Sequence, residues 1–221
     1  MTERAVAGGP VHRIGVLGAG HVGPVFARIA IDAGYRVAIA ASGDPEKIAL
    51  VTQVVMPGAE ARWAADAVAD ADLVVLAMPL HKFVTFDPSV LAHRLVIDAM
   101  NYWPAADGVL ELFQERRHSS SEVVQRRLAG ATVIKSLNHI GYQDLEDARR
   151  PAGSPERRAI GVAGDDAGAA KIVAELVERL GYDAVLLGDL SAGRILEPGG
   201  PVFGALLARP DFELAVGARA A

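Results

Sequence analysis

The chain has 221 residues, of which 51% are hydrophobic, with a net charge of −5 and no cysteine. This length can bury a substantial core as one domain, or as one domain with a small appendage. The absence of cysteine excludes disulfides and thiolate chemistry. The negative charge argues against nucleic-acid binding, because phosphates attract a basic surface. Apolar runs are short and broken by charges, so no stretch is expected to span a bilayer. We expect a cytoplasmic protein that does not bind membranes. Residues 1–12 are interpreted as a loose N-terminal tail and not as a signal peptide.

The first motif is the sequence RIGVLGAGHVG at residues 13–23. Ile14–Leu17 predicts a buried strand, and Val22–Ala33 predicts a helix that stops at Gly34. The G-x-G-x-x-G turn between them lets Gly18 bend the chain, Gly20 bring the backbone close to a pyrophosphate, and Gly23 pack the helix on the strand. A second strand, Tyr35–Ala41, follows in the order that a dinucleotide site requires. The alternative is a glycine-rich turn without a ligand.

The following elements continue the alternation of strands and helices. Continuous Val, Ile and Leu runs with helices between them are typical of a parallel sheet covered on both faces. The sequence therefore predicts a Rossmann-type, doubly wound α/β fold with a mostly parallel sheet. The expected strands are 60–63, 72–78, 94–99 and 131–137, and the expected helices are 44–56, 64–71, 105–118 and 119–129.

A turn-rich segment at 149–155 predicts a boundary in the chain. Residues 13–150 would form the dinucleotide-binding domain, and residues 151–221 a small C-terminal extension or cap. Within this extension we expect a strand at 158–163, a helix at 167–180, a strand at 184–188 and a mixed segment at 190–214.

The end of the second strand bears on the choice of nucleotide. Sites specific for NAD usually place a carboxylate there, to accept a hydrogen bond from the ribose 2′-hydroxyl. This chain has Ser42 and Gly43 instead, followed by Lys47 in the next helix. Ser42 and the Gly43 N–H can hydrogen-bond a 2′-phosphate, and Lys47 can supply positive charge, so the sequence favours NADP over NAD. The alternatives are a plain turn hydroxyl and a solvated helix lysine.

Taken together, these motifs resemble the family of NADPH-dependent coenzyme F420 reductases (F420H2:NADP oxidoreductases). The resemblance rests on GAGHVG at 18–23, Ser42 with Lys47, Met78-Pro79, SLNHIGY at 136–142, VAGDD at 162–166 and GRILE at 193–197. It implies a phosphate loop at Ala19, Gly20, His21 and Val22, and a 2′-phosphate site at Ser42, Gly43 and Lys47. It also places Met78, Pro79, Lys82, Asn101, Tyr142 and Leu214 near the nicotinamide half, and implies direct hydride transfer between nicotinamide and deazaflavin rings.

Three residues after predicted strands are candidates for contacts with the reacting groups. Asn101 and Asn138 can orient a nicotinamide amide or a substrate oxygen at the carboxyl edge of the sheet. His139 is a weak catalytic candidate that could donate a proton to a carbonyl or imine, and a hydrogen-bonded loop histidine is the simpler interpretation. The six histidines show no spacing typical of metal ligands, so no metal site is expected.

The sequence thus predicts an oxidoreductase that binds NADP(H) and exchanges hydride with a flat small-molecule redox substrate, with coenzyme F420 as the first choice. One alternative is a small NADPH-dependent carbonyl, imine or quinone reductase that uses His139 or Tyr142 as proton donor. The other is a non-catalytic module that senses NADP(H). The sequence leaves open whether the protein forms a homodimer.

Overall fold

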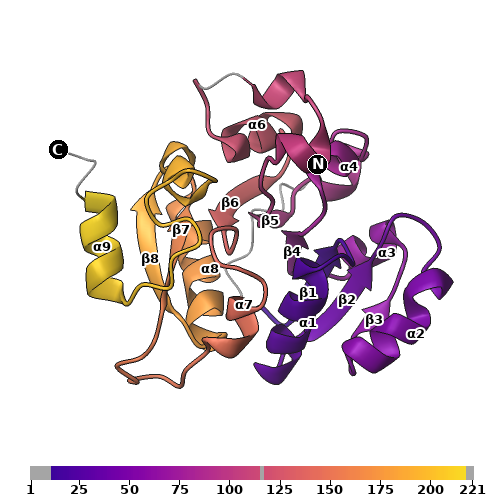
Figure 1. Cartoon of the computed structure of the whole chain (residues 1–221). Coiled ribbons are helices and arrows are strands. Elements are labelled where there is room, and N and C mark those ends of the chain that lie inside the picture. The colour runs from indigo at the N-terminus through magenta and orange to yellow at the C-terminus, as the bar shows by residue number, and fades with distance from the viewer. Residues whose placement is uncertain (1–10, 115–116, 218–221) are drawn as a thin grey trace.

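In the computed structural model, residues 11–114 and 117–217 are described. Most of the predicted tail, residues 1–10, lies outside the described residues. The strands form one eight-stranded sheet with the order β3-β2-β1-β4-β5-β6-β7-β8, which crosses Figure 1 from β3 on the right to β8 on the left. The first six strands are parallel and are β1 Arg13–Leu17, β2 Arg36–Ala40, β3 Glu60–Ala61, β4 Leu73–Leu76, β5 Leu95–Asp98 and β6 Thr132–Ser136. The order 3-2-1-4-5-6 is that of a Rossmann fold, so the predicted fold class is confirmed.

Both faces of the sheet are covered because successive strand residues point to opposite sides. Ile14 and Val16 pack in one core with Phe26 of α1, whereas Leu17 packs in a second core with Val124 of α6. The first face carries α1 Val22–Asp32, α7 Asp144–Asp147 and α8 Ala167–Arg179. The second face carries α3 Ala64–Ala69, α4 Leu80–Phe83, the 3-10 turn Pro88–Leu91 and α6 Ser120–Arg127. Helix α2, Glu46–Val55, lies beside β3. Among the described residues, no helix has the length and apolar character needed to cross a membrane.

The C-terminal part extends the sheet with β7, Ala159–Ala163, and β8, Asp183–Gly188. Strand β7 is antiparallel to β6 and pairs with it through Ala163 and Val162. Residues 159–161 therefore project past the carboxyl end of β6. After β8 come the 3-10 segment η3, Leu190–Leu196, and α9, Arg209–Gly217. The sheet continues without a break past the turn at 149–155, and the predicted division at residue 150 stays a prediction.

The predicted helix at 105–118 is wrong over most of its length. Helix α5 spans only Pro104–Asp107 and ends at Gly108, whose φ is +72°; the short 3-10 turn η2, Glu111–Phe113, follows. The phenol of Tyr102 donates to the Gly108 carbonyl and accepts from the Leu110 N–H, which folds the chain back at this point. The next predicted helix is confirmed by α6, which begins with a capping box between Ser119 and Glu122.

Candidate functional site

The glycine loop between β1 and α1 uses its three glycines in two different ways. A Cβ on Gly18, whose φ is +127°, would lie 2.3 Å from the carbonyl oxygen of Ala77. A Cβ on Gly23 would lie 1.8 Å from the carbonyl oxygen of Gly18. A Cβ on Gly20 would meet nothing within 4 Å. Packing inside the protein therefore demands Gly18 and Gly23, whereas Gly20 borders open space that a ligand can enter.

The amino end of α1 faces this open space. Its N-cap residue is His21, which makes no side-chain cap, and its first turn holds no acidic residue. The first N–H groups of a helix have no partner within the helix and carry partial positive charge. The loop residues Ala19 and Val22 are half-buried, and His21 is exposed. This arrangement can bind a phosphate group.

The end of β2 carries the residues predicted to select the nucleotide. Ser42 and Gly43 are exposed, and Gly43 has a φ of +107°, a backbone conformation that favours glycine over arginine. The carboxylate of Asp44 accepts a hydrogen bond of 2.9 Å from the Glu46 N–H, so it is held at the start of α2. Lys47 is exposed in the first turn of the same helix. A ligand at this corner meets a hydroxyl and an ammonium group.

The loops after β5 and β6 bring two predicted asparagines together. The Asn101 side-chain amide donates to the Asn138 carbonyl oxygen at 2.8 Å. The Asn138 side-chain amide donates to the Asn101 side-chain oxygen at 3.0 Å and to the Leu196 carbonyl at 2.6 Å. Met78 and Pro79 follow β4, the strand next to β5, and Lys82 is exposed on α4. These residues share the carboxyl edge of the parallel strands.

A buried ion pair lies directly below the asparagines, and sequence reasoning missed it. Asp98 and Lys135 are register partners on β5 and β6, and both are almost fully buried. The Lys135 ammonium donates to the Met100 carbonyl at 2.6 Å and lies 3.3 Å from the Asp98 carboxylate. That carboxylate also accepts from the Ser121 hydroxyl. The available signal was one charged residue in each of two predicted buried strands.

His139, the weak catalytic candidate, is enclosed. Its Nε2 accepts a hydrogen bond of 3.2 Å from the Gly161 N–H, and its ring lies 5.5 Å from that of Phe212 on α9. Burial lowers the pKa of His139 to about 4, with a smaller opposing effect of the Val202 carbonyl. A neutral, buried imidazole is not the protonated form that donates a proton to a substrate, so this geometry favours the structural interpretation.

Tyr142 and Leu214 were both placed near the nicotinamide by resemblance, and they lie in different places. The exposed ring of Tyr142 stacks on His21 of the glycine loop, with centroids 5.1 Å apart and an interplanar angle of 15°. Leu214 is 72% exposed on α9. It follows the buried Phe212 by two residues, a rotation of about 200° around a helix, so it faces away from the core that α9 covers. Its role in binding stays a prediction.

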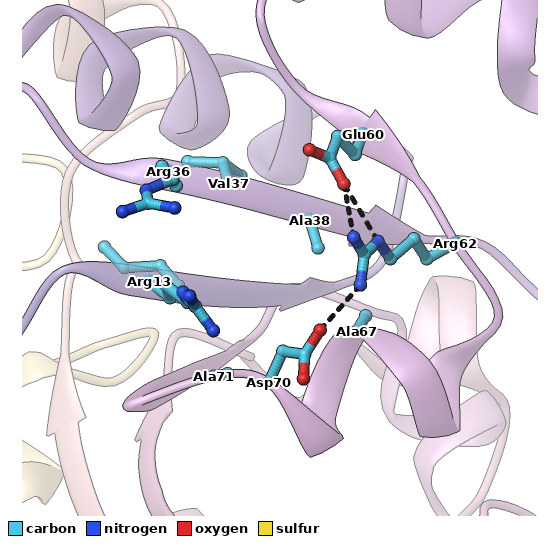
Figure 2. A pocket seen from close by; sticks show the side chains of 10 residues that line it. Arg13, Arg36, Val37, Ala38, Glu60, Arg62, Ala67, Asp70 and Ala71 are labelled. Atoms are coloured by element: carbon cyan, nitrogen blue, oxygen red, sulfur yellow. Dashed lines mark hydrogen bonds and ion pairs between the residues drawn. The ribbon is translucent and has the colours of Figure 1, made fainter.

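Figure 2 shows a hollow that lies apart from this site. It has a volume of about 170 Å³ and is bordered by Arg13 and Arg36, the first residues of β1 and β2. The guanidinium of Arg62 in this hollow is held by Glu60 and Asp70 (Figure 2). Because parallel strands begin at the edge opposite their carboxyl ends, the hollow and the candidate site lie at opposite edges.

Fold and loop together define the class of α/β proteins that bind dinucleotides at the carboxyl edge of a Rossmann sheet. Residues 13–102 match the model of one family in this class, described as NADP oxidoreductase coenzyme F420-dependent. This match confirms the resemblance seen in the sequence for that part of the chain.

Three solved structures are similar to this chain. A hypothetical protein from Sinorhizobium meliloti is 28% identical, with a TM-score of 0.77 over 90% of this chain and 96% of its own. A protein from Arthrobacter sp. FB24 that carries the provisional name F420-dependent NADP-reductase is 28% identical, with a TM-score of 0.71 over 89% and 99% of the two chains. An imine reductase from Pseudomonas sp. shares the fold, at 18% identity and a TM-score of 0.56, over 82% of this chain and 57% of its own. A comparison with curated proteins finds no match.

Proposed function

We propose that this protein binds NADP(H) along the carboxyl edge of its sheet and exchanges hydride with a flat redox partner, with coenzyme F420 as the first choice. The observation that carries the proposal is the open space at Gly20 beside the uncapped amino end of α1. Loop backbone and helix N–H groups converge there on the place where a pyrophosphate binds in Rossmann proteins. The phosphate contacts are assigned to Gly18, Ala19, Gly20, His21, Val22 and Gly23.

The preference for the phosphorylated nucleotide is assigned to Ser42, Gly43 and Lys47. The Asp44 carboxylate accepts from the Glu46 N–H and is thereby held at the start of α2, which fits a role as helix cap. The exposed Ser42 hydroxyl and Lys47 ammonium are free to turn toward an anion. Charge-assisted hydrogen bonds of this kind are about twice as strong as neutral ones, which supports NADP over NAD.

Direct hydride transfer between two rings suits the groups at the carboxyl edge of the sheet. Asn101 and Asn138 offer neutral amide groups there, and His139 is buried and neutral. Hydride transfer between two stacked rings depends on positioning more than on a proton donor. NADPH supplies the hydride when bound, while Met78, Pro79, Lys82, Asn101, Asn138 and Tyr142 are assigned to its nicotinamide half. The name of the Arthrobacter relative supports F420 as the partner.

The test is a fluorescence titration with NADPH and NADH, followed by mixing of the NADPH complex with F420, flavins and simple carbonyls. We expect NADPH to bind more tightly than NADH and F420 to reoxidise it. If a carbonyl reoxidises the bound cofactor while F420 fails to do so, the choice of partner is wrong.

One observation favours a second candidate, a small carbonyl or imine reductase. Tyr142 is 39% exposed beside the glycine loop and carries a phenol that could serve as a proton donor. Such a reductase needs a proton donor worth about 10²- to 10⁴-fold in rate. In that case Tyr142→Phe would abolish most turnover, whereas F420 reduction would change little.

A further inference from the structure

A pair of aromatic rings stands at the same edge and has no part in the nucleotide contacts. Trp103 and Phe203 meet with ring centroids 5.6 Å apart and an interplanar angle of 65°. Trp103 is 46% exposed, and Phe203 is half-buried. We call this pair the aromatic wall. The two residues come from distant parts of the chain, the loop after β5 and the segment between η3 and α9.

Two contacts place the aromatic wall over the carboxyl ends of β5 and β6. Trp103 follows Asn101 by two residues, and Asn101 is hydrogen-bonded to Asn138 after β6. Gly204, next to Phe203, donates its N–H to the His139 carbonyl at 2.7 Å. The wall is thus tied on both sides to the loops that hold the asparagine pair.

The backbone of Trp103 is fixed although its ring is exposed. Its N–H donates to the Asp107 carboxylate at 3.0 Å. Asp107 also accepts from the His81 backbone N–H at 3.1 Å and lies 3.0 Å from the His81 ring. A large apolar surface held rigidly in water is unfavourable, and at the edge of a binding site it marks a surface that a ligand covers.

The expected path of the nucleotide does not cover the aromatic wall, so the wall is available to the second substrate. In a Rossmann site the adenosine end lies near the end of β2, and the dinucleotide crosses the edge at the switch point between β1 and β4. The nicotinamide therefore reaches the ends of β4 and β5. The next position along the edge is over β5 and β6, where the aromatic wall stands.

We infer that Trp103 and Phe203 bind the planar heteroaromatic ring of the hydride partner and hold it against the nicotinamide. This inference rests on the proposed function and narrows its substrate class. An aromatic ring binds more tightly when it contacts the wall, whereas a small aliphatic carbonyl or imine gains little binding free energy from it. Aromatic contacts of this kind correspond to about a tenfold change in affinity.

The first experiment measures binding without turnover. The chain has two tryptophans, so Trp63→Phe leaves Trp103 as the sole tryptophan. Trp63 is 51% exposed just before α3 and is a matched control site. We expect saturable quenching of Trp103 emission by F420 or FMN in Trp63→Phe, and none of Trp63 emission in Trp103→Phe. Absence of saturable quenching by both probes in Trp63→Phe, or equal quenching in both variants, overturns the inference.

The second experiment measures turnover. Trp103→Leu should raise KM for the ring acceptor about tenfold, with KM for NADPH unchanged and Trp63→Leu without effect. Phe203→Leu, on a different segment, should give a smaller change in the same direction. An unchanged acceptor KM in both wall variants overturns the inference even when NADPH is oxidised normally. Failure of NADPH to bind refutes the proposed function instead and leaves the quenching result to decide on the wall.

Discussion

The carbonyl oxygen of Gly18 stands 1.8 Å from the position that a Cβ on Gly23 would occupy, so loop and helix pack backbone against backbone. A side chain at Gly23 must push the two apart. Gly20, two residues from Gly18 in the same loop, borders open space. The loop therefore separates residues needed for folding from the residue that borders the proposed ligand.

This difference gives the first prediction. Gly20→Val should leave the thermal midpoint almost unchanged and abolish NADPH binding, because the added methyl groups fill the space assigned to the pyrophosphate. Gly23→Val is the matched control and should destabilise the protein by about 1–3 kcal/mol or more through overpacking. Calorimetry and NADPH fluorescence measure the two effects. Near-normal NADPH affinity in folded Gly20→Val would contradict the site.

The second prediction concerns the choice of nucleotide. Gly43 has a φ of +107°, which would strain any side chain at that position, so Ser42 offers the cleaner test. Ser42→Asp should weaken NADPH binding about tenfold or more and spare NADH, because a carboxylate repels the 2′-phosphate and can accept from a ribose hydroxyl. Ser42→Ala should lose only part of the NADPH affinity. Equal responses of both nucleotides to Ser42→Asp would rule out this corner as the selecting site.

The third prediction uses the pKa of His139. Burial holds the pKa of His139 at about 4, below the ordinary histidine value of 6.5. The unfolded chain then binds more protons between these values, so the contribution of His139 to stability is complete above pH 6.5 and is lost as pH falls toward 4. The loss should total about 3 kcal/mol. Urea unfolding of His139→Gln across this range should show a correspondingly flatter pH dependence, and an unchanged slope would exclude a buried neutral ring.

The same residue gives a test of whether the reaction needs a proton from His139. If hydride transfer runs directly from ring to ring, His139→Ala should slow NADPH oxidation by F420 less than about tenfold. The reason is that the variant then removes no proton donor, a group that usually contributes about 10²- to 10⁴-fold in rate. Stopped-flow traces of the parent and the variant provide the comparison. A loss of about a hundredfold or more at unchanged NADPH affinity would assign the proton transfer to His139 after all.

The fourth prediction concerns the buried pair below the asparagines. Lys135→Met should destabilise the protein by about 3–5 kcal/mol, since it leaves the Asp98 carboxylate buried without a cation. Adding Asp98→Asn should recover most of the loss, because the buried charge is then removed. Turnover in the double variant should stay reduced if the Met100 carbonyl needs the Lys135 ammonium to hold Asn101 in place. Full recovery of both stability and turnover would show that the pair has no role in positioning.

Local signals explain what the sequence predicted well. The glycine loop and the apolar runs of β1, β4, β5 and β6 are each encoded within a few residues, and the carboxyl-edge rule then brings Asn101 and Asn138 together. Specific side-chain contacts explain the failures, because such contacts do not follow from local patterns of hydrophobicity. The helix expected at 105–118 is broken by the bonds of Tyr102, and the pairing of Trp103 with Phe203 leaves no periodic pattern in the sequence.

The reversed direction of β7 has a consequence for how this architecture can diversify. Since residues 159–161 rise past the end of β6, the chain that follows β8 returns to the same edge and supplies Phe203 there. The nucleotide loop and the second ring of the wall are thus encoded at opposite ends of the polypeptide. If the proposed function holds, substitutions between residues 197 and 207 should change the choice of hydride acceptor without changing nucleotide binding.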